Sequence, residues 1–156
     1  MLYFEDVQVG DRYHSAEHVM TEEEIIAFGR QYDPQLFHTD AEKAKATFFG
    51  RLVASGWHTA AVSMRLMVLS NMELDGGVIG SGVEAMRWPR PTFPGDRLRV
   101  VMKVEAKSEV QNRPERGSIK LRCRTLNQHD KIVQDMTANL VIARRPVVAQ
   151  PEQSES

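Results

Sequence analysis

The stretch that most constrains the fold is an apolar run over residues 57–69, WHTAAVSMRLMVL, which is entered through Ser55 and Gly56. Its residues are apolar or small nearly all round, and Arg65 is its only formal charge. That pattern is typical of a helix that is buried on every side. Such a helix needs a cover, which the rest of the chain has to supply.

The second half of the chain supplies that cover as strands. Apolar and polar residues alternate there with a period of two, which indicates antiparallel strands with one apolar and one wet face. The strand segments are 78–79, 83–88, 98–104, 119–123 and 136–142. We therefore expect a sheet of about five mostly consecutive strands, and an α+β fold in which a curved antiparallel β-sheet wraps one long central helix.

The first half of the chain reads as an entry segment and two short helical pieces. Residues 4–20 are expected to be extended, with a weak strand at 13–19. Thr21, followed by three glutamates, predicts a capped helix that ends where Pro34 disfavours the helical conformation of the preceding residue. A loop over 33–38 and a short helix over 41–48 should follow.

Composition limits the possible functions. The chain has 156 residues, which suits one domain, and its net charge of -1 gives no overall field to attract nucleic acid or an anionic membrane surface. A single cysteine, Cys123, excludes an internal disulfide and fits a reducing cytosol. With no signal-peptide pattern or membrane-spanning run, the expected location is cytoplasmic. The tail, 146–156, is expected to be disordered because it contains mainly Pro, Gln, Glu and Ser.

Four residues before and at the start of the apolar run could form a reactive site. Asp33 and His38 lie five positions apart, and Ser55 is a suitable N-cap that leaves the amide of Gly56 at the positive end of the helix dipole. An acid, an imidazole and a helix N-terminus can move a proton while they hold an oxyanion. A capping acid and a structural histidine would give the same spacing.

Other suggestive side chains have ordinary interpretations. His58 is more simply a hydrogen-bonded core residue than a catalytic one. His14 and His18 would need a third ligand to hold a metal, and no metal site is expected. Met64 and Met67 could line an acyl tunnel or simply fill the core.

Three motifs in order carry a resemblance to a known family. They are DPQLFH (33–38), FGRLVASG (49–56) and RWPRPTFPGD (87–96). They resemble the MaoC-like dehydratases and (R)-specific enoyl-CoA hydratases of the hotdog superfamily, over roughly residues 1–145, which would form a single domain. Gln35 and Leu36 stand where that family usually has Asn and Pro, and Ser55 replaces its usual His.

The resemblance implies an activity and roles for residues. The activity is that of a hydro-lyase, which adds water reversibly to a 2-enoyl thioester to give a 3-hydroxyacyl thioester. Asp33 would be the base, His38 the proton donor, and the backbone N–H of Gly56 the oxyanion donor. Ser55 and Trp57, which flank Gly56, would contact the substrate.

The resemblance also implies partners. Coenzyme A would enter as part of the substrate, with no separate cofactor, and Arg51, Arg87 and Arg90 are candidates to bind its phosphates. Pairing of sheets would give a homodimer. Two alternatives stay open: a hotdog thioesterase, and a non-catalytic acyl-thioester binding subunit.

Overall fold

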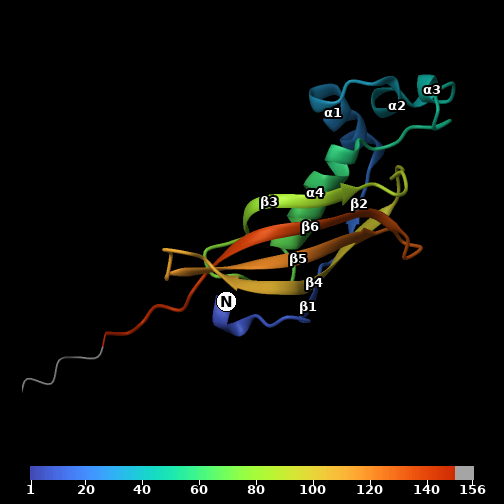
Figure 1. Ribbon diagram of the computed structural model, residues 1–156. Helices are drawn as coiled ribbons and strands as arrows, with labels where there is room; N and C mark the ends of the chain where they lie inside the picture. Colours follow the sequence, from blue (N-terminus) through green and yellow to red (C-terminus); the bar gives the residue numbers. More distant parts are fainter. Residues whose placement is uncertain (150–156) are drawn as a thin grey trace, which may run out of the picture.

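The computed structural model describes residues 1–149, and in them an antiparallel sheet curves around one helix (Figure 1). The sheet has six strands in the order β1-β4-β5-β6-β3, with β2 paired to one end of β4. The strands are β1 (Arg12–His14), β2 (His18–Val19), β3 (Ile79–Arg87), β4 (Arg97–Glu109), β5 (Arg116–Leu126) and β6 (Ile132–Ala143). The central helix is α4 (Gly56–Val68). The predicted α+β architecture is confirmed.

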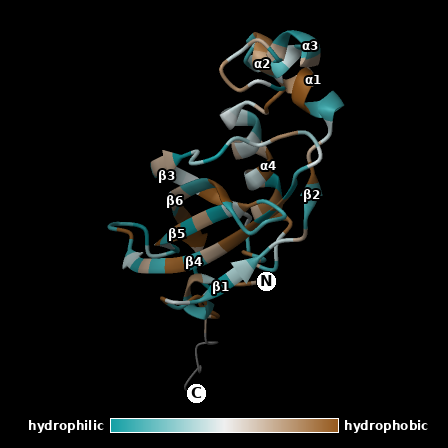
Figure 2. Cartoon of the chain, turned by 90° about the vertical axis from the view of Figure 1, so that its right-hand side faces the viewer, coloured by the Kyte–Doolittle hydropathy of each residue, from teal (hydrophilic) through white to brown (hydrophobic). Residues whose placement is uncertain are grey.

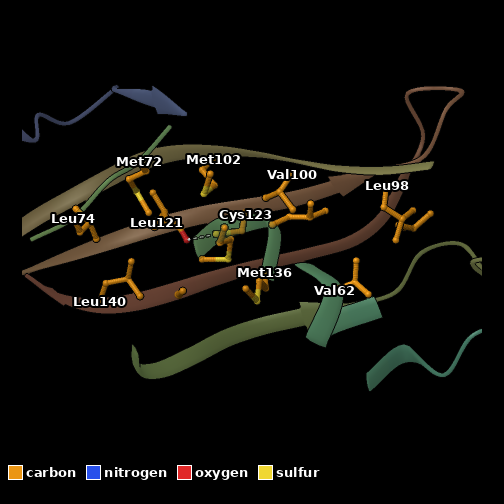
Figure 3. Close-up of a cluster of buried hydrophobic side chains, with 14 of the residues drawn as sticks. Val62, Met72, Leu74, Leu98, Val100, Met102, Leu121, Cys123, Met136 and Leu140 are labelled. Atoms are coloured by element: carbon orange, nitrogen blue, oxygen red, sulfur yellow. Dashed lines mark hydrogen bonds between the residues drawn. The ribbon is translucent and has the colours of Figure 1, made fainter. Parts of the chain in front are cut away.

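The period-two pattern of β4, β5 and β6 corresponds, as predicted, to strands with one buried face and one more exposed face. Buried and more exposed residues alternate along all three strands, and the hydropathy colours alternate along β4 and β5 in Figure 2. Figure 3 shows the inward side chains of these strands, including Val100, Leu121 and Leu140, gathered with Val62 of α4. Burying one such side chain fully contributes about 1.5–3 kcal/mol, so this layer holds the sheet on the helix.

The central helix begins as predicted, but it is not buried on every side. Ser55 is its N-cap and accepts a hydrogen bond from the Trp57 N–H. One face, which includes Val62 and Leu66, packs into the core. The expectation of burial on every side is wrong at Trp57, Met64 and Val68, whose apolar side chains are exposed. The described chain therefore covers α4 only in part.

Three short helices stand beyond one end of the sheet, near the start of α4 (Figure 1). They are α1 (Glu22–Tyr32), α2 (Leu36–Thr39) and α3 (Ala41–Ala44). Thr21 caps α1 as predicted, by accepting a hydrogen bond from the Glu24 N–H. Two expectations are wrong: residues 36–39 are helical where a loop was predicted, and the helix predicted over 41–48 ends at Ala44.

The entry segment is less regular than predicted. Residues 4–6 form a 3-10 helix, and the single weak strand expected at 13–19 is two short strands, β1 and β2. Both pair with β4.

The remaining expectations concern Cys123, the tail and membranes. Cys123 is buried among the apolar side chains of the core, as predicted. Residues 146–149 contain no helix or strand, and the rest of the predicted disordered tail lies outside the described residues. Within residues 1–149, no helix combines the length and apolar character that crossing a membrane requires.

Candidate active site

Asp33 and His38 meet where α1 passes into α2. Asp33 is the C-cap of α1, and its N–H donates to the Gly29 carbonyl over 2.9 Å. Pro34 then turns the chain, and His38 lies one helical turn further on, in α2. His38 Nε2 is 3.1 Å from Asp33 Oδ2. A spacing of five residues thus places the imidazole directly against the carboxylate.

Gly29 allows this close arrangement. A Cβ atom on Gly29 would lie 2.6 Å from the carbonyl oxygen of His38 and 2.9 Å from its Cβ. Real Cβ atoms do not approach backbone so closely, so a side chain here would push α2 away from α1. The glycine within α1 therefore helps to place the imidazole.

Both nitrogens of the His38 ring have a partner. Nδ1 is 2.6 Å from the Val53 carbonyl oxygen, and the side chain is buried. A carbonyl only accepts, so Nδ1 carries a proton. Nε2 faces the Asp33 carboxylate, which also accepts, so a direct hydrogen bond requires the doubly protonated imidazolium. The contact therefore has the geometry of an ion pair when the imidazole carries both protons.

The Asp33 carboxylate receives further hydrogen bonds on both of its oxygens. The Ser55 hydroxyl donates to Oδ2 over 2.7 Å, and the Gln35 amide donates to Oδ1 over 2.7 Å. Burial alone would raise the pKa of Asp33, but these two donors and the nearby His38 outweigh burial and lower it. The carboxylate side chain is 19% exposed, so it is held in its charged form without being sealed from solvent.

Gly56 begins α4 beside this pair, and its N–H contacts no acceptor in residues 1–149. The first amides of a helix lack intrahelical partners and lie at the positive end of its dipole. Glycine is also required by space, because a Cβ there would lie 2.8 Å from two ring carbons of Trp88. The Trp88 ring is fixed in turn by a hydrogen bond of 3.0 Å from Nε1 to Gln134 Oε1.

A cavity of about 320 Å³ joins these features. His38 and Gly56 both line it, whereas Asp33 contacts it through His38. The complete lining is Phe37, His38, Phe49, Val53, Ala54, Gly56, Thr59, Trp88, Pro89, Arg90, Pro91 and Thr92. The His38 imidazole and the free backbone N–H of Gly56 therefore face one largely apolar space, and Asp33 lies behind the imidazole.

Two of the three candidate phosphate-binding arginines line a cavity, and the third does not. Arg51 and Arg90 line a second cavity of about 520 Å³, which shares Arg90 and Pro91 with the first. The guanidinium of Arg51 lies 3.9 Å from the centre of the Phe93 ring. Arg87 lines neither of these cavities.

Trp57 and His58, near the start of α4, do not have the environments that the sequence predicted. Trp57 also lies outside both cavities: its ring packs edge-on against Trp88 and is otherwise exposed. His58 is buried and stacked on Phe28, with Nε2 4.0 Å from Glu24, and burial lowers its pKa. Its Nδ1 has no partner among the described residues, and 4.0 Å from Nε2 to Glu24 is too long for a hydrogen bond. The expected burial of His58 is confirmed, but the expected hydrogen bond is not found.

Sequence reasoning missed four residues of this region. Gln35 was noted only as a departure from a motif, although an amide two residues after an aspartate can reach its carboxylate. Trp88 sits within the third motif, but only the fold reveals its contact with Gly56. Thr59 and Thr92 carry no sequence signal, because 33 residues separate them.

Comparison with known proteins identifies relatives of the whole fold. The family model described as "MaoC like domain" matches residues 6–121. A MaoC-like dehydratase from Rhodospirillum rubrum is 47% identical, with 94% of this chain and 100% of that chain covered and a TM-score of 0.90. The (R)-hydratase PhaJ1 from Pseudomonas aeruginosa is 22% identical, with 99% and 96% covered and a TM-score of 0.73.

A third structure names the architecture. A Mycobacterium tuberculosis protein described as having a double hotdog fold is 16% identical, with a TM-score of 0.76. The match covers 96% of this chain and 46% of that one. The sheet that curves around α4 is therefore a hotdog fold, as predicted.

Proposed function

This chain belongs to the MaoC-like family of hydratases and dehydratases, and from that premise we propose that it adds water reversibly across the double bond of a 2-enoyl thioester. Residues 1–145 act as one domain in this proposal. The observation that carries it is the Asp33–His38 contact of 3.1 Å beside the free N–H of Gly56. Hydration requires a base, an acid and an oxyanion donor, and these three groups can supply them.

Each group has a distinct step. The Asp33 carboxylate takes a proton from water as the water oxygen bonds to C3 of the enoyl group. The His38 imidazolium gives its Nε2 proton to C2, and the Gly56 N–H donates to the thioester oxygen, where negative charge develops. Asp33 is then neutral and protonated, and His38 is neutral. A proton passed from Asp33 to His38 restores the starting pair, and the reverse sequence dehydrates a 3-hydroxyacyl thioester.

The carrier of the acyl group is proposed to be coenzyme A, which is part of the substrate. Arg51 and Arg90 flank a cavity that adjoins the reactive one, and guanidinium groups match phosphate oxygens. This arrangement would seat the phosphates in one cavity and the thioester in the next.

A homodimer is proposed because residues 1–149 leave two apolar surfaces uncovered. Met64 and Val68 of α4 are 40% and 52% exposed, and Ile79 and Val83 of the edge strand β3 are each 54% exposed. An open sheet edge that carries apolar side chains is a template for pairing with a second copy. We propose a two-fold dimer that covers both surfaces.

The test of the activity is the loss of the enoyl-thioester absorbance when purified protein is mixed with 2-butenoyl-CoA. We expect hydration by the wild type, and a loss of about 10²–10⁴-fold in rate for Asp33→Asn and for His38→Ala. Circular dichroism should show that both variants remain folded. Release of free thiol would indicate a thioesterase, and binding without either signal would indicate a binding subunit.

A further inference from the structure

The reactive cavity has a polar floor. Thr59 of α4 and Thr92 of the segment between β3 and β4 both line it, and they are only 2% and 3% exposed. The walls beside them are aromatic, from Phe37, Phe49 and Trp88. A site for a plain hydrocarbon chain has no need of two buried hydroxyl groups at this place.

These two hydroxyl groups are poorly paired with each other. Thr59 Oγ1 lies 3.4 Å from Thr92 Oγ1, whereas ordinary O–H···O hydrogen bonds are about 2.5–3.0 Å. No other protein group in residues 1–149 hydrogen-bonds to either hydroxyl. By contrast, Ser63, one turn further along α4, donates to the Thr59 carbonyl over 2.7 Å and lies 2.6 Å from the Thr125 hydroxyl. The deficit is specific to the pair that faces the cavity.

Thr59 lies about one helical turn from Gly56 along α4. Thr59 follows Gly56 by three residues, which corresponds to about 4.5 Å along the helix axis. Three bonds of an extended chain span about 3.8 Å. If the thioester oxygen binds the Gly56 N–H and the acyl chain runs along α4, the hydroxyls of Thr59 and Thr92 come within reach of C4 and its substituent.

The surroundings of the Thr59 and Thr92 hydroxyls suit a neutral polar group better than a carboxylate. Apart from His38, the only basic side chain that residues 1–149 place on the cavity wall is that of Arg90, whose Nη1 donates to the Ile132 carbonyl over 3.1 Å. A buried carboxylate would lack a dedicated cation, whereas a hydroxyl can both donate and accept among two threonine hydroxyls.

We infer that this site is built for short 2-enoyl thioesters that carry a hydroxyl group on C4, held by Thr59 and Thr92. The inference rests on the proposed hydratase function and names its substrate class. A methyl group at the same place would leave the two buried hydroxyls with only their long mutual contact of 3.4 Å, and a polar site rejects an apolar analogue when its buried groups stay poorly paired.

The experiment compares kcat/KM for 4-hydroxy-2-butenoyl-CoA and 2-butenoyl-CoA. The wild type should prefer the hydroxylated substrate by at least about tenfold, and matched polar sites reach about 10⁴. Thr59→Val and Thr92→Val keep the shape of the side chain but remove the hydroxyl, so each should erase most of the preference. Ser63→Ala is the control, because it removes a buried hydroxyl of the same helix that does not line the cavity.

The outcomes separate this inference from the function on which it rests. Hydration of both substrates with equal kcat/KM, or a preference that survives both Thr→Val changes, overturns the substrate class and leaves the hydratase function standing. A change of preference in Ser63→Ala as large as in the threonine variants would also overturn it, because the effect would then be general. Hydration of neither substrate would overturn the function and the substrate class together.

Discussion

Ser55 has two tasks, and removing its hydroxyl should disturb both. The hydroxyl proton goes to Asp33 Oδ2, and the oxygen accepts the Trp57 N–H over 3.3 Å as the cap of α4. Loss of an N-cap costs about 0.5–2 kcal/mol, and loss of a hydrogen bond to a charged group about 1.5–3 kcal/mol. Ser55 is 1% exposed, so water cannot easily replace the hydroxyl. We expect Ser55→Ala to lower the free energy of unfolding by about 2–5 kcal/mol in a denaturant titration.

The same change should alter the dependence of hydration on pH. The Ser55 hydrogen bond favours the charged form of Asp33 and so lowers the pKa of this carboxyl. Without the hydroxyl, the pKa of Asp33 rises. Since the base must be ionised, activity is present above this pKa and is lost as the pH falls through it. The acid limb of the profile of kcat/KM against pH should therefore move to higher pH.

Thr21→Ala is the matched control. Thr21 caps α1 by accepting the Glu24 N–H over 3.2 Å, and it makes no hydrogen bond to Asp33. Its loss should destabilise the fold through the cap alone and leave the acid limb in place, and Ser55→Thr, which keeps a hydroxyl, should resemble the wild type. An unmoved acid limb in Ser55→Ala, or an equal shift in Thr21→Ala, would refute the proposed link between Ser55 and Asp33.

Three further results follow from packing and burial. Gly56→Ala should lower stability by about 1–3 kcal/mol in a denaturant titration, because the new Cβ meets the Trp88 ring at 2.8 Å; a gain in stability, as at an open helix position, would contradict that contact. Val83→Lys should give monomers in light scattering, because it places a charge on the apolar edge strand, and a wild type that is itself monomeric would remove the dimer from the account. Burial, with a smaller effect from Asp135, raises the pKa of the Cys123 thiol to about 12, so a thiol reagent at neutral pH should react only after unfolding; fast reaction in the native state would show that the thiol is accessible.

The strands could be predicted from the sequence because their signal is local. Each of β4, β5 and β6 alternates apolar and polar residues, and the sheet buries one face, so the period reports the fold directly. The same reasoning placed the caps of Thr21 and Ser55 at the starts of α1 and α4, because those hydrogen bonds join near neighbours.

Expectations failed where burial or conformation depends on distant contacts. Hydrophobicity alone cannot tell a side chain covered by its own sheet, such as Val62, from one left open, such as Val68. The four-residue helix α2 is too short for a periodic signal, and its place depends on close packing of His38 against Gly29.

The candidate site was partly predictable for the same reason. The five-residue spacing, read with the family motifs, suggested that Asp33 and His38 belong together. The bond from Ser55 to Asp33 spans 22 residues, and the floor pair spans 33, so neither could be found before the fold.

The most direct test of the hydratase account is to incubate the protein with 2-butenoyl-CoA in water enriched in oxygen-18 and to analyse the thioester by mass spectrometry. We expect an intact 3-hydroxyacyl thioester with heavy oxygen at C3, formed by the wild type and not by Asp33→Asn. Heavy oxygen in a released carboxylic acid, with free coenzyme A, would contradict it.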